Sequence, residues 1–410
     1  MSRTVIVGAS VGGVRTAQAL RSEGYDGEIV LLERETELPY NKPPLSKALL
    51  KGTSDADSIR LLTREAAEEL DLELVLGAEV TALDPALRQI QLADDTRIAY
   101  DNVVVATGAD ARPSPWGRCP GVHVVRTLAD ARRLRADLDN GGTIVVVGSG
   151  FIGAEVAATA RDLGLEVHLV DPLPTPMSRG FEESVGRIFL GLHQDHGVQP
   201  HFGTGVEGID GERGSFTVRL SDGTALSAGA VVVGIGADPN TTWLASSGLA
   251  VEDGLVCDQY LRAEGAPGVY AVGDVCRWRD ATTDELIRVE HWTNAVDQAL
   301  CVARTIVAPD SPRPYHAIDY VWSDQYDWKI QVVGHHEGAV ADTLLGDVAS
   351  GCFAVLYAGP GGSLLGAAVA NWPKALITTR KAMAAGSTYD DVLAKLEPAA
   401  PRPVRDMEGA

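Results

Sequence analysis

The chain is poor in cysteine, and it has no cysteines spaced closely enough in sequence to act together. Its 410 residues contain Cys119, Cys257, Cys276, Cys301 and Cys352. They form no C-x-x-C pair and no cluster with metal-ligand spacing, so we expect no metal site. Isolated thiols of this kind are expected to be reduced and mostly structural, as they are in a cytoplasm.

Positive charge and long apolar runs are also scarce. The 35 lysines and arginines face 56 acids, and the net charge of −21 disfavours nucleic acid and anionic membranes as partners. No run approaches the ~18 apolar residues of a membrane span. A strand-like segment begins almost at once, which leaves no room for a signal peptide. We therefore expect a cytoplasmic protein of two or three domains.

Glycine, in contrast, recurs in two turns with the same surroundings. Each turn follows an apolar strand and precedes a helix, and an acid closes the next strand about 20 residues later. The acids are Glu33 and Asp171. The turn residues are Gly8, Ser10, Gly12 and Gly13 in the first turn and Gly148, Gly150, Phe151, Ile152 and Gly153 in the second.

The two turns predict two bound dinucleotides. A helix that begins at such a turn directs free N–H groups at a pyrophosphate, and its acid accepts hydrogen bonds from ribose hydroxyls. The second turn is a complete G-x-G-x-x-G, whereas the first has Ser10 at the middle position. Either turn alone could be an ordinary strand–helix connection. Together they indicate a protein that passes electrons between two dinucleotides.

One predicted domain is inserted in the sequence between the two segments of another. Residues 1–112 and 238–311 are expected to form one Rossmann-like domain, and 113–237 a second. Residues 312–410 are expected to form a carboxy-terminal α+β domain with helices near 373–385 and 389–397. A further amphipathic helix is predicted over 293–307. The predicted fold class is α/β, with two Rossmann-like dinucleotide-binding domains and this third domain.

Further motifs lie outside the turns. They are Pro43-Pro44-Leu45-Ser46-Lys47, Ala106-Thr107-Gly108, Arg126-Thr127-Leu128, Gly273-Asp274 and Trp322-Ser323-Asp324-Gln325-Tyr326. With these motifs the chain resembles, over nearly its whole length, the FAD-dependent, NADH-linked ferredoxin reductases of bacterial oxygenase systems. These are reductases of the putidaredoxin reductase type, with glutathione-reductase-like architecture. The resemblance implies that the first turn binds FAD and the second NADH.

The resemblance also implies individual cofactor contacts. Glu33 would hold the adenosine ribose, Val80 would pack on adenine, and Asp274 would accept hydrogen bonds from the ribityl chain. Asp274 could instead cap a helix before Val275, and Arg126, implied to lie near the flavin, could be a surface charge. The other implied cofactor contacts are Lys42, Ala106, Thr107, Gly108, Gly236, Gly273, Glu290, His291, Trp292 and Trp322.

Two residues are implied to act in catalysis. Lys47 would lie at the flavin edge where hydride arrives, and Glu155 beside the nicotinamide carboxamide. As alternatives, Lys47 could be an exposed lysine and Glu155 a solvated helix position. Trp292 and Trp322 could be core aromatics. His291 is expected to be structural, because hydride transfer to a flavin needs no general base.

The chain lacks the dithiol of the disulfide reductases with this architecture. Residues 42–47 contain no cysteine where those enzymes carry C-x-x-x-x-C, and a related oxidase would need one reactive cysteine there. An outside one-electron acceptor therefore fits better. We expect a ferredoxin–NAD(+) reductase, monomeric or weakly dimeric, whose [2Fe–2S] ferredoxin feeds a cytochrome P450 or a dioxygenase. A rubredoxin reductase and an NADH-sensing flavoprotein resembling apoptosis-inducing factor are the alternatives.

Cofactor preference and docking can be predicted in outline. The carboxylate of Asp171 would repel a 2′-phosphate and so favours NADH, although Arg179 leaves some use of NADPH open. We hypothesise that the ferredoxin docks on local positive charge. The residues concerned are Arg277, Arg279, Lys329, Lys374, Arg380 and Lys381.

Overall fold

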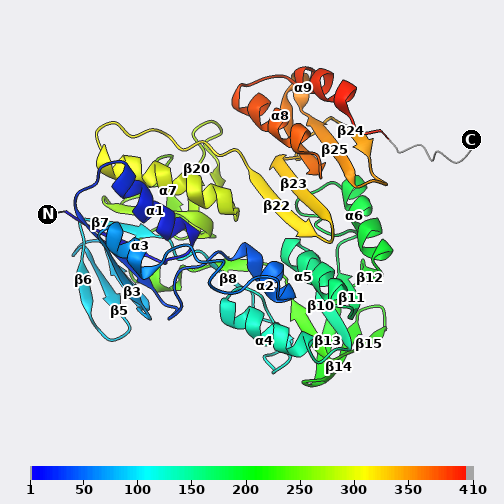
Figure 1. The fold of residues 1–410 in the computed structure, drawn as a ribbon. Coiled ribbons are helices and arrows are strands. Elements are labelled where there is room, and N and C mark those ends of the chain that lie inside the picture. Colours follow the sequence, from blue (N-terminus) through cyan, green and yellow to red (C-terminus); the bar gives the residue numbers. More distant parts are fainter. Residues whose placement is uncertain (1, 403–410) are drawn as a thin grey trace, which may run out of the picture. The chain divides into compact units, whose positions relative to one another are not determined.

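The computed structural model describes residues 2–402 (Figure 1), and the chain divides into two compact units. Unit 1 contains Met1–Lys42, Ser54–Asp110 and Ala237–Ala317. Unit 2 contains Pro43–Thr53, Ala111–Gly236 and Ile318–Ala410. Both units are therefore assembled from segments that are far apart in the sequence. Within residues 2–402, no helix has the length and apolar character needed to cross a membrane.

Unit 1 is built on a parallel sheet with the strand order β19-β7-β1-β2-β3. Its strands are β1 (Arg3–Val7), β2 (Glu28–Glu33), β3 (Leu72–Leu76), β7 (Asn102–Val105) and β19 (Val269–Ala271). The central strands are apolar and buried, as strands covered on both faces must be. Helices α1 (Val11–Ser22) and α7 (Trp292–Val307) pack against each other.

Shorter elements complete unit 1. They are helix α3 (Arg64–Glu69), the meander β4 (Val80–Asp84), β5 (Gln89–Leu92) and β6 (Arg97–Ala99), and the sheet β18 (Leu255–Cys257), β20 (Cys276–Arg279) and β21 (Leu286–Ile287). One apolar core runs through all of them.

Unit 2 begins with a second parallel sheet, in the order β12-β11-β10-β16-β9. Its strands are β9 (Val122–His123), β10 (Thr143–Val147), β11 (Glu166–Asp171), β12 (Gln199–Phe202) and β16 (Ala230–Val233). The helices are α4 (Leu128–Leu138), α5 (Phe151–Asp162) and α6 (Glu183–Asp195), and a meander follows in β13 (Val206–Glu212), β14 (Ser215–Leu220) and β15 (Ala225–Ala228). Two apolar clusters involve the alternating side chains of this sheet.

The carboxy-terminal part of unit 2 is an antiparallel sheet in the order β22-β23-β26-β25-β24. Its elements are β22 (Tyr320–Gln325), β23 (Trp328–Gly334), β24 (Ala341–Asp347), β25 (Cys352–Ala358), β26 (Leu364–Ala370), α8 (Pro373–Ala384) and α9 (Tyr389–Leu396). Side chains of α8 and α9 share one apolar cluster with the sheet, and those of α6 share another. This sheet is therefore packed onto the second Rossmann-like sheet domain as part of one unit.

The segment Pro43–Thr53 also belongs to unit 2, although it lies between two segments of unit 1 in sequence. It forms the short turn η1 (Pro43–Ser46) and helix α2 (Ala48–Lys51). The predicted fold class is confirmed, because two parallel sheets and a carboxy-terminal antiparallel sheet are present. The three long predicted helices also form, with ends that differ by one residue from those expected.

Candidate functional site

The first glycine of each turn is required by the fold. Gly8 has φ +104° and Gly148 has φ +94°, which L side chains rarely adopt. A Cβ atom on Gly8 would lie 2.4 Å from the carbonyl oxygen of Ala106, and one on Gly148 would lie 2.2 Å from that of Gly234. Each glycine thus lets its turn pass close to the end of a neighbouring strand.

The last glycine of each turn lets a helix approach its strand. A Cβ atom on Gly13 would lie 1.8 Å from the carbonyl oxygen of Gly8. The equivalent atom on Gly153 would lie 1.9 Å from that of Gly148. Because these contacts repeat so closely, both turns have the same construction.

Each acid is hydrogen-bonded to its own turn. Glu33 accepts from the N–H of Ala9 at 2.8 Å, and Asp171 accepts from the N–H of Ser149 at 2.6 Å. Asp171 is buried and accepts a second backbone N–H, from Leu173, at 2.9 Å. The Ser149 hydroxyl donates a third bond to Asp171, also at 2.9 Å. A carboxylate has about four acceptor positions, so Asp171 keeps about one for a ribose hydroxyl.

The middle of the second turn has room for a ligand. Gly150 has φ −64°, which any residue can adopt, and a Cβ atom there would meet nothing within 4 Å. The fold therefore does not require this glycine, whereas a closely approaching pyrophosphate would. Helices α1 and α5 also begin without a side-chain cap, unlike α4, which Thr127 caps. Both turns fit a dinucleotide on these grounds.

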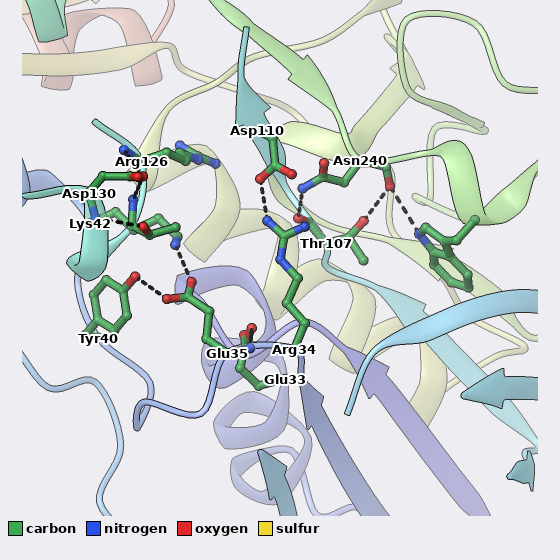
Figure 2. A network of polar contacts seen from close by, with 12 residues as sticks. Glu33, Arg34, Glu35, Tyr40, Lys42, Thr107, Asp110, Arg126, Asp130 and Asn240 are labelled. Atoms are coloured by element: carbon green, nitrogen blue, oxygen red, sulfur yellow. Dashed lines mark hydrogen bonds and ion pairs between the residues drawn. The ribbon is translucent and has the colours of Figure 1, made fainter. Parts of the chain in front are cut away.

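In unit 1, charged and polar side chains lie just beyond Glu33 (Figure 2). Glu35 accepts from the hydroxyl of Tyr40 at 2.8 Å and forms an ion pair with Lys42 at 3.4 Å. The ammonium of Lys42 also lies 4.9 Å from the centre of the Tyr40 ring. Lys42 is thus held by two neighbours on its own chain segment.

The Ala106-Thr107-Gly108 motif binds the chain where it returns to unit 1. The hydroxyl of Thr107 donates to the carbonyl of Asn240 at 2.9 Å, and the Asn240 side chain donates back to the carbonyl of Thr107 at 2.9 Å (Figure 2). Ala106 and Gly108 flank this pair, and Gly236 immediately precedes the return. The motif therefore holds two chain segments of unit 1 together, in addition to being a predicted cofactor contact.

Asp274 is not a helix N-cap, so that alternative is wrong. It is the middle residue of the short turn η3 (Gly273–Val275), and Val272 stands at the capping position. The N–H of Gly273 donates to the side chain of Gln298 on α7 at 2.7 Å. This bond ties the Gly-Asp motif to the long helix.

The start of α7 carries the predicted Glu290-His291-Trp292 segment. His291 is the N-cap residue and provides no side-chain cap, and Glu290 is ion-paired with Arg288 at 2.6 Å. The indole of Trp292 donates to Asn41 at 3.1 Å. Trp292 is only partly buried, so the core-aromatic alternative is wrong for it.

Val80 and Arg126, two more predicted cofactor contacts, are both half-buried. Val80 opens β4 and packs, half-buried, against the core of unit 1. In unit 2, Arg126 is half-buried, and its backbone N–H donates to Asp130 at 3.2 Å. Arg126 is therefore not a fully solvated charge.

The two predicted catalytic residues meet in unit 2. Glu155 lies on α5 and is only 3 % exposed, and the ammonium of Lys47 is 3.0 Å from its Oε1 atom. Ser46 donates to Oε2 of the same carboxylate, and Ser323 donates to Oε1 at 2.7 Å. The solvated-helix alternative for Glu155 is wrong, and so is the exposed alternative for Lys47, whose side chain is 15 % exposed.

The protonation of Glu155 is set by opposing influences. Burial is the largest and raises the pKa of this carboxyl above its ordinary value, because water no longer stabilises the charge. The positive charge of Lys47 and the hydrogen bonds from Ser46 and Ser323 act against it. Buried carboxylates balanced in this way are typical of functional sites.

Lys47 also contacts the carboxy-terminal sheet. Its ammonium is 3.5 Å from Asp324 and 5.7 Å from the centre of the Trp322 ring. Trp322 is partly buried and stacks on Tyr320, with 6.0 Å between ring centres, so it is not a core aromatic. The cluster thus unites η1, α5 and β22, which are far apart in sequence.

Sequence reasoning identified neither hydroxyl as a site residue. Ser46 and Ser323 both belong to motifs named in the sequence analysis, but nothing in a sequence shows that they meet one carboxylate.

The basic residues proposed for docking are partly neutralised, since Arg277 pairs with Glu252 at 3.1 Å and Arg279 with Glu264 at 3.5 Å.

The chain is similar to known proteins over nearly its whole length. Residues 2–299 match the model of the pyridine nucleotide-disulphide oxidoreductases, and residues 320–398 match a reductase C-terminal model. Rhodocoxin reductase of Rhodococcus erythropolis is 37 % identical over 383 residues, which is 93 % of this chain and 89 % of that protein.

Other relatives belong to known electron-transfer systems. The ferredoxin–NAD(+) reductase component of an anthranilate 1,2-dioxygenase system from Burkholderia cepacia is 35 % identical over 94 % of this chain and 95 % of its own length. The reductase in the covalent putidaredoxin reductase–putidaredoxin complex superposes with a TM-score of 0.90 and 31 % identity, over 97 % of this chain and 99 % of that one. The resemblance noted in the sequence is confirmed, and the chain belongs to the pyridine nucleotide-disulphide oxidoreductase family, whose members bind FAD and NAD(H).

Proposed function

We propose that the chain is an NADH-dependent flavoprotein reductase that delivers electrons to a [2Fe–2S] ferredoxin. One observation carries this proposal. The segment that would hold a redox dithiol in a disulfide reductase instead supplies Lys47 and Ser46 to the buried carboxylate of Glu155. Residues 42–47 contain no cysteine that could accept electrons, so we infer a separate acceptor.

The two turns divide the cofactors between them. We propose FAD at the first turn, with Glu33 on its adenosine ribose, Val80 on its adenine and Asp274 on its ribityl chain. NADH would bind at the second turn, with Asp171 on its ribose. Bound FAD accepts a hydride and can release the electrons one at a time, which is what coupling NADH to an iron–sulfur protein requires.

The side chains of the protein would orient the two cofactors and stabilise the charge that develops during hydride transfer. The ammonium of Lys47, held by Glu155 and Asp324, would place positive charge where negative charge enters the flavin ring. The Glu155 carboxylate would accept a hydrogen bond from the nicotinamide carboxamide. Partial positive charge at the start of α7 would act in the same sense as Lys47.

The partner and the setting are inferred from the relatives and the sequence. The anthranilate and rhodocoxin systems and the putidaredoxin complex pair such reductases with small electron carriers. For this chain we propose a ferredoxin that feeds a cytochrome P450 or a dioxygenase. Five free cysteines fit a reducing cytoplasm.

We further propose that the protein is a monomer or weak dimer with three domains. Residues 1–112 and 238–311 would form the first domain, residues 113–237 the second and residues 312–410 the third.

Anaerobic stopped-flow spectroscopy tests the proposal. NADH should bleach the flavin rapidly, and a [2Fe–2S] ferredoxin should restore its colour much faster than rubredoxin or dioxygen does. Reoxidation by rubredoxin alone would transfer the assignment to a rubredoxin reductase. Slow bleaching that leaves a stable complex would indicate an NADH sensor and refute the enzyme.

A further inference from the structure

Ser323 is the one group by which the carboxy-terminal sheet bonds directly to the Glu155 carboxylate in the described part of the chain. Its hydroxyl lies 2.7 Å from Oε1, the oxygen that the Lys47 ammonium also contacts. Ser323 is fully buried within β22, where it pairs with Ile330 of β23. Its position is therefore fixed by the sheet.

Gln325 determines where the proton of this hydroxyl points. Its amide nitrogen donates to the oxygen of Ser323 at 3.0 Å and approaches the sulfur of Met177 at 3.5 Å. An amide nitrogen can only donate, so Ser323 accepts from Gln325 and its single proton remains for Glu155. Gln325 is also fully buried.

The other contacts show why this proton matters. Glu155 is buried, and burial raises the pKa of its carboxyl and so favours the neutral form. The charged groups that face it are Lys47 and, across the Lys47 ammonium, Asp324. Loss of one directed donor would therefore move the carboxyl toward protonation and weaken its hold on the lysine.

We propose that Ser323, oriented by Gln325, is a positioning residue that keeps Glu155 ionised and its Oε1 atom aligned with Lys47. The carboxy-terminal domain would then contribute directly to hydride transfer, in addition to any role in docking. The effect on catalysis rests on the proposed function, but the effect on the protonation of Glu155 does not.

Infrared titration of the flavin-loaded protein tests the protonation directly. Protein labelled with ¹³C-glutamate is compared with Glu155→Gln, so that the remaining difference band reports the carboxyl of Glu155. We expect its midpoint to move to higher pH in Ser323→Ala and in Gln325→Leu. Ser323→Thr keeps the hydroxyl and should restore the original midpoint.

Kinetics tests the consequence in parallel. Ser323→Ala should lower kcat/KM for NADH by about tenfold, mainly through kcat, which corresponds to about 1.4 kcal/mol of lost transition-state stabilisation. In the Glu155→Gln background the same change should have little further effect, because it acts through that carboxylate.

Two variants in the same domain are matched controls. Tyr389→Phe removes a buried hydroxyl that donates to Thr343 at 2.5 Å, and Thr379→Val removes a buried hydroxyl that donates to Ala375 at 2.9 Å. Neither contacts Glu155, and both should leave the midpoint unchanged. The inference is overturned if Ser323→Ala keeps the wild-type midpoint, or if the controls move it equally. A shifted midpoint without NADH-dependent flavin reduction would uphold it and refute only the proposed function.

Discussion

Replacing Gly150 with alanine should separate the stability of the second turn from its function. Gly150 is the N-cap of α5, with φ −64° and ψ −178°, a conformation open to alanine. An added Cβ atom would meet no protein atom within 4 Å. Alanine caps a helix less well than glycine, at a cost of about 0.5–1 kcal/mol. It also restricts the unfolded chain, which returns about 0.4–1 kcal/mol.

These two contributions nearly cancel, so the folded protein should tolerate the change. We expect the melting temperature of Gly150→Ala to lie within about 3 °C of the wild type. The new methyl group would, however, occupy the space beside the free N–H groups of α5. NADH affinity should therefore fall at least about tenfold, or about 1.4 kcal/mol.

Gly153→Ala, three residues later, should behave in the opposite way. Its Cβ atom would lie 1.9 Å from the carbonyl oxygen of Gly148, so the helix must move away from strand β10. Overpacking of this kind costs about 1–3 kcal/mol, and we expect a clear loss of thermal stability together with the loss of NADH binding.

Calorimetric unfolding and NADH titration of the same preparations measure both effects. Gly191→Ala, within α6 and also without atoms near its added Cβ, is the matched control and should keep full NADH affinity. The reasoning is refuted if Gly150→Ala binds NADH as tightly as the wild type. It is equally refuted if Gly150→Ala unfolds as readily as Gly153→Ala.

Three further predictions concern charge. Asp171→Ala should lower kcat/KM for NADH and raise NADPH use relative to it, and an unchanged ratio in steady-state kinetics would contradict the role of this acid. For Asp137, burial raises the pKa, but hydrogen bonds from Arg213 and His123 outweigh it and hold the pKa below its ordinary value. Its stabilising contribution is therefore present above the ordinary pKa and is lost as pH falls through the lowered one. Asp137→Asn should cost about 1–2 kcal/mol in urea unfolding at pH 7, since Arg213 is half exposed and stays solvated, and progressively less toward pH 3, whereas a constant difference would argue against this account. Ferredoxin reduction should fall steeply between low and high salt if docking depends on local positive charge, and a salt-independent rate would exclude that.

The local architecture was predictable because local physics determines it. A strand that ends in Gly8 or Gly148, and a helix that begins at once, leave few other conformations for the turn. The helix of 373–385 was equally predictable, since Pro373 fits a first helical turn and the following pattern is amphipathic.

The site itself depended on contacts between distant segments, and single-sequence reasoning does not provide these. In the sequence, Glu155 cannot be told from a solvated residue on a helix. Only the fold brings Ser323, from another part of the chain, against its carboxylate. Lys47 likewise cannot be told from an exposed lysine, because its partners Glu155 and Asp324 are distant in sequence. Only the resemblance, which carries information from other proteins, placed both residues in the site.

The Trp322–Tyr326 motif also gains a physical meaning. Trp322 and Asp324 contact Lys47, Ser323 contacts Glu155, and Gln325 contacts Met177. Tyr326 bonds to His193 at 2.9 Å and stacks on His196, with 3.7 Å between ring centres.

Every residue of this motif thus contacts a partner in the segments Pro43–Thr53 or Ala111–Gly236 of unit 2, outside the antiparallel sheet. Under the proposed function the carboxy-terminal domain would then take part in catalysis, because the buried carboxylate of Glu155 has its full set of donors only when β22 is in place.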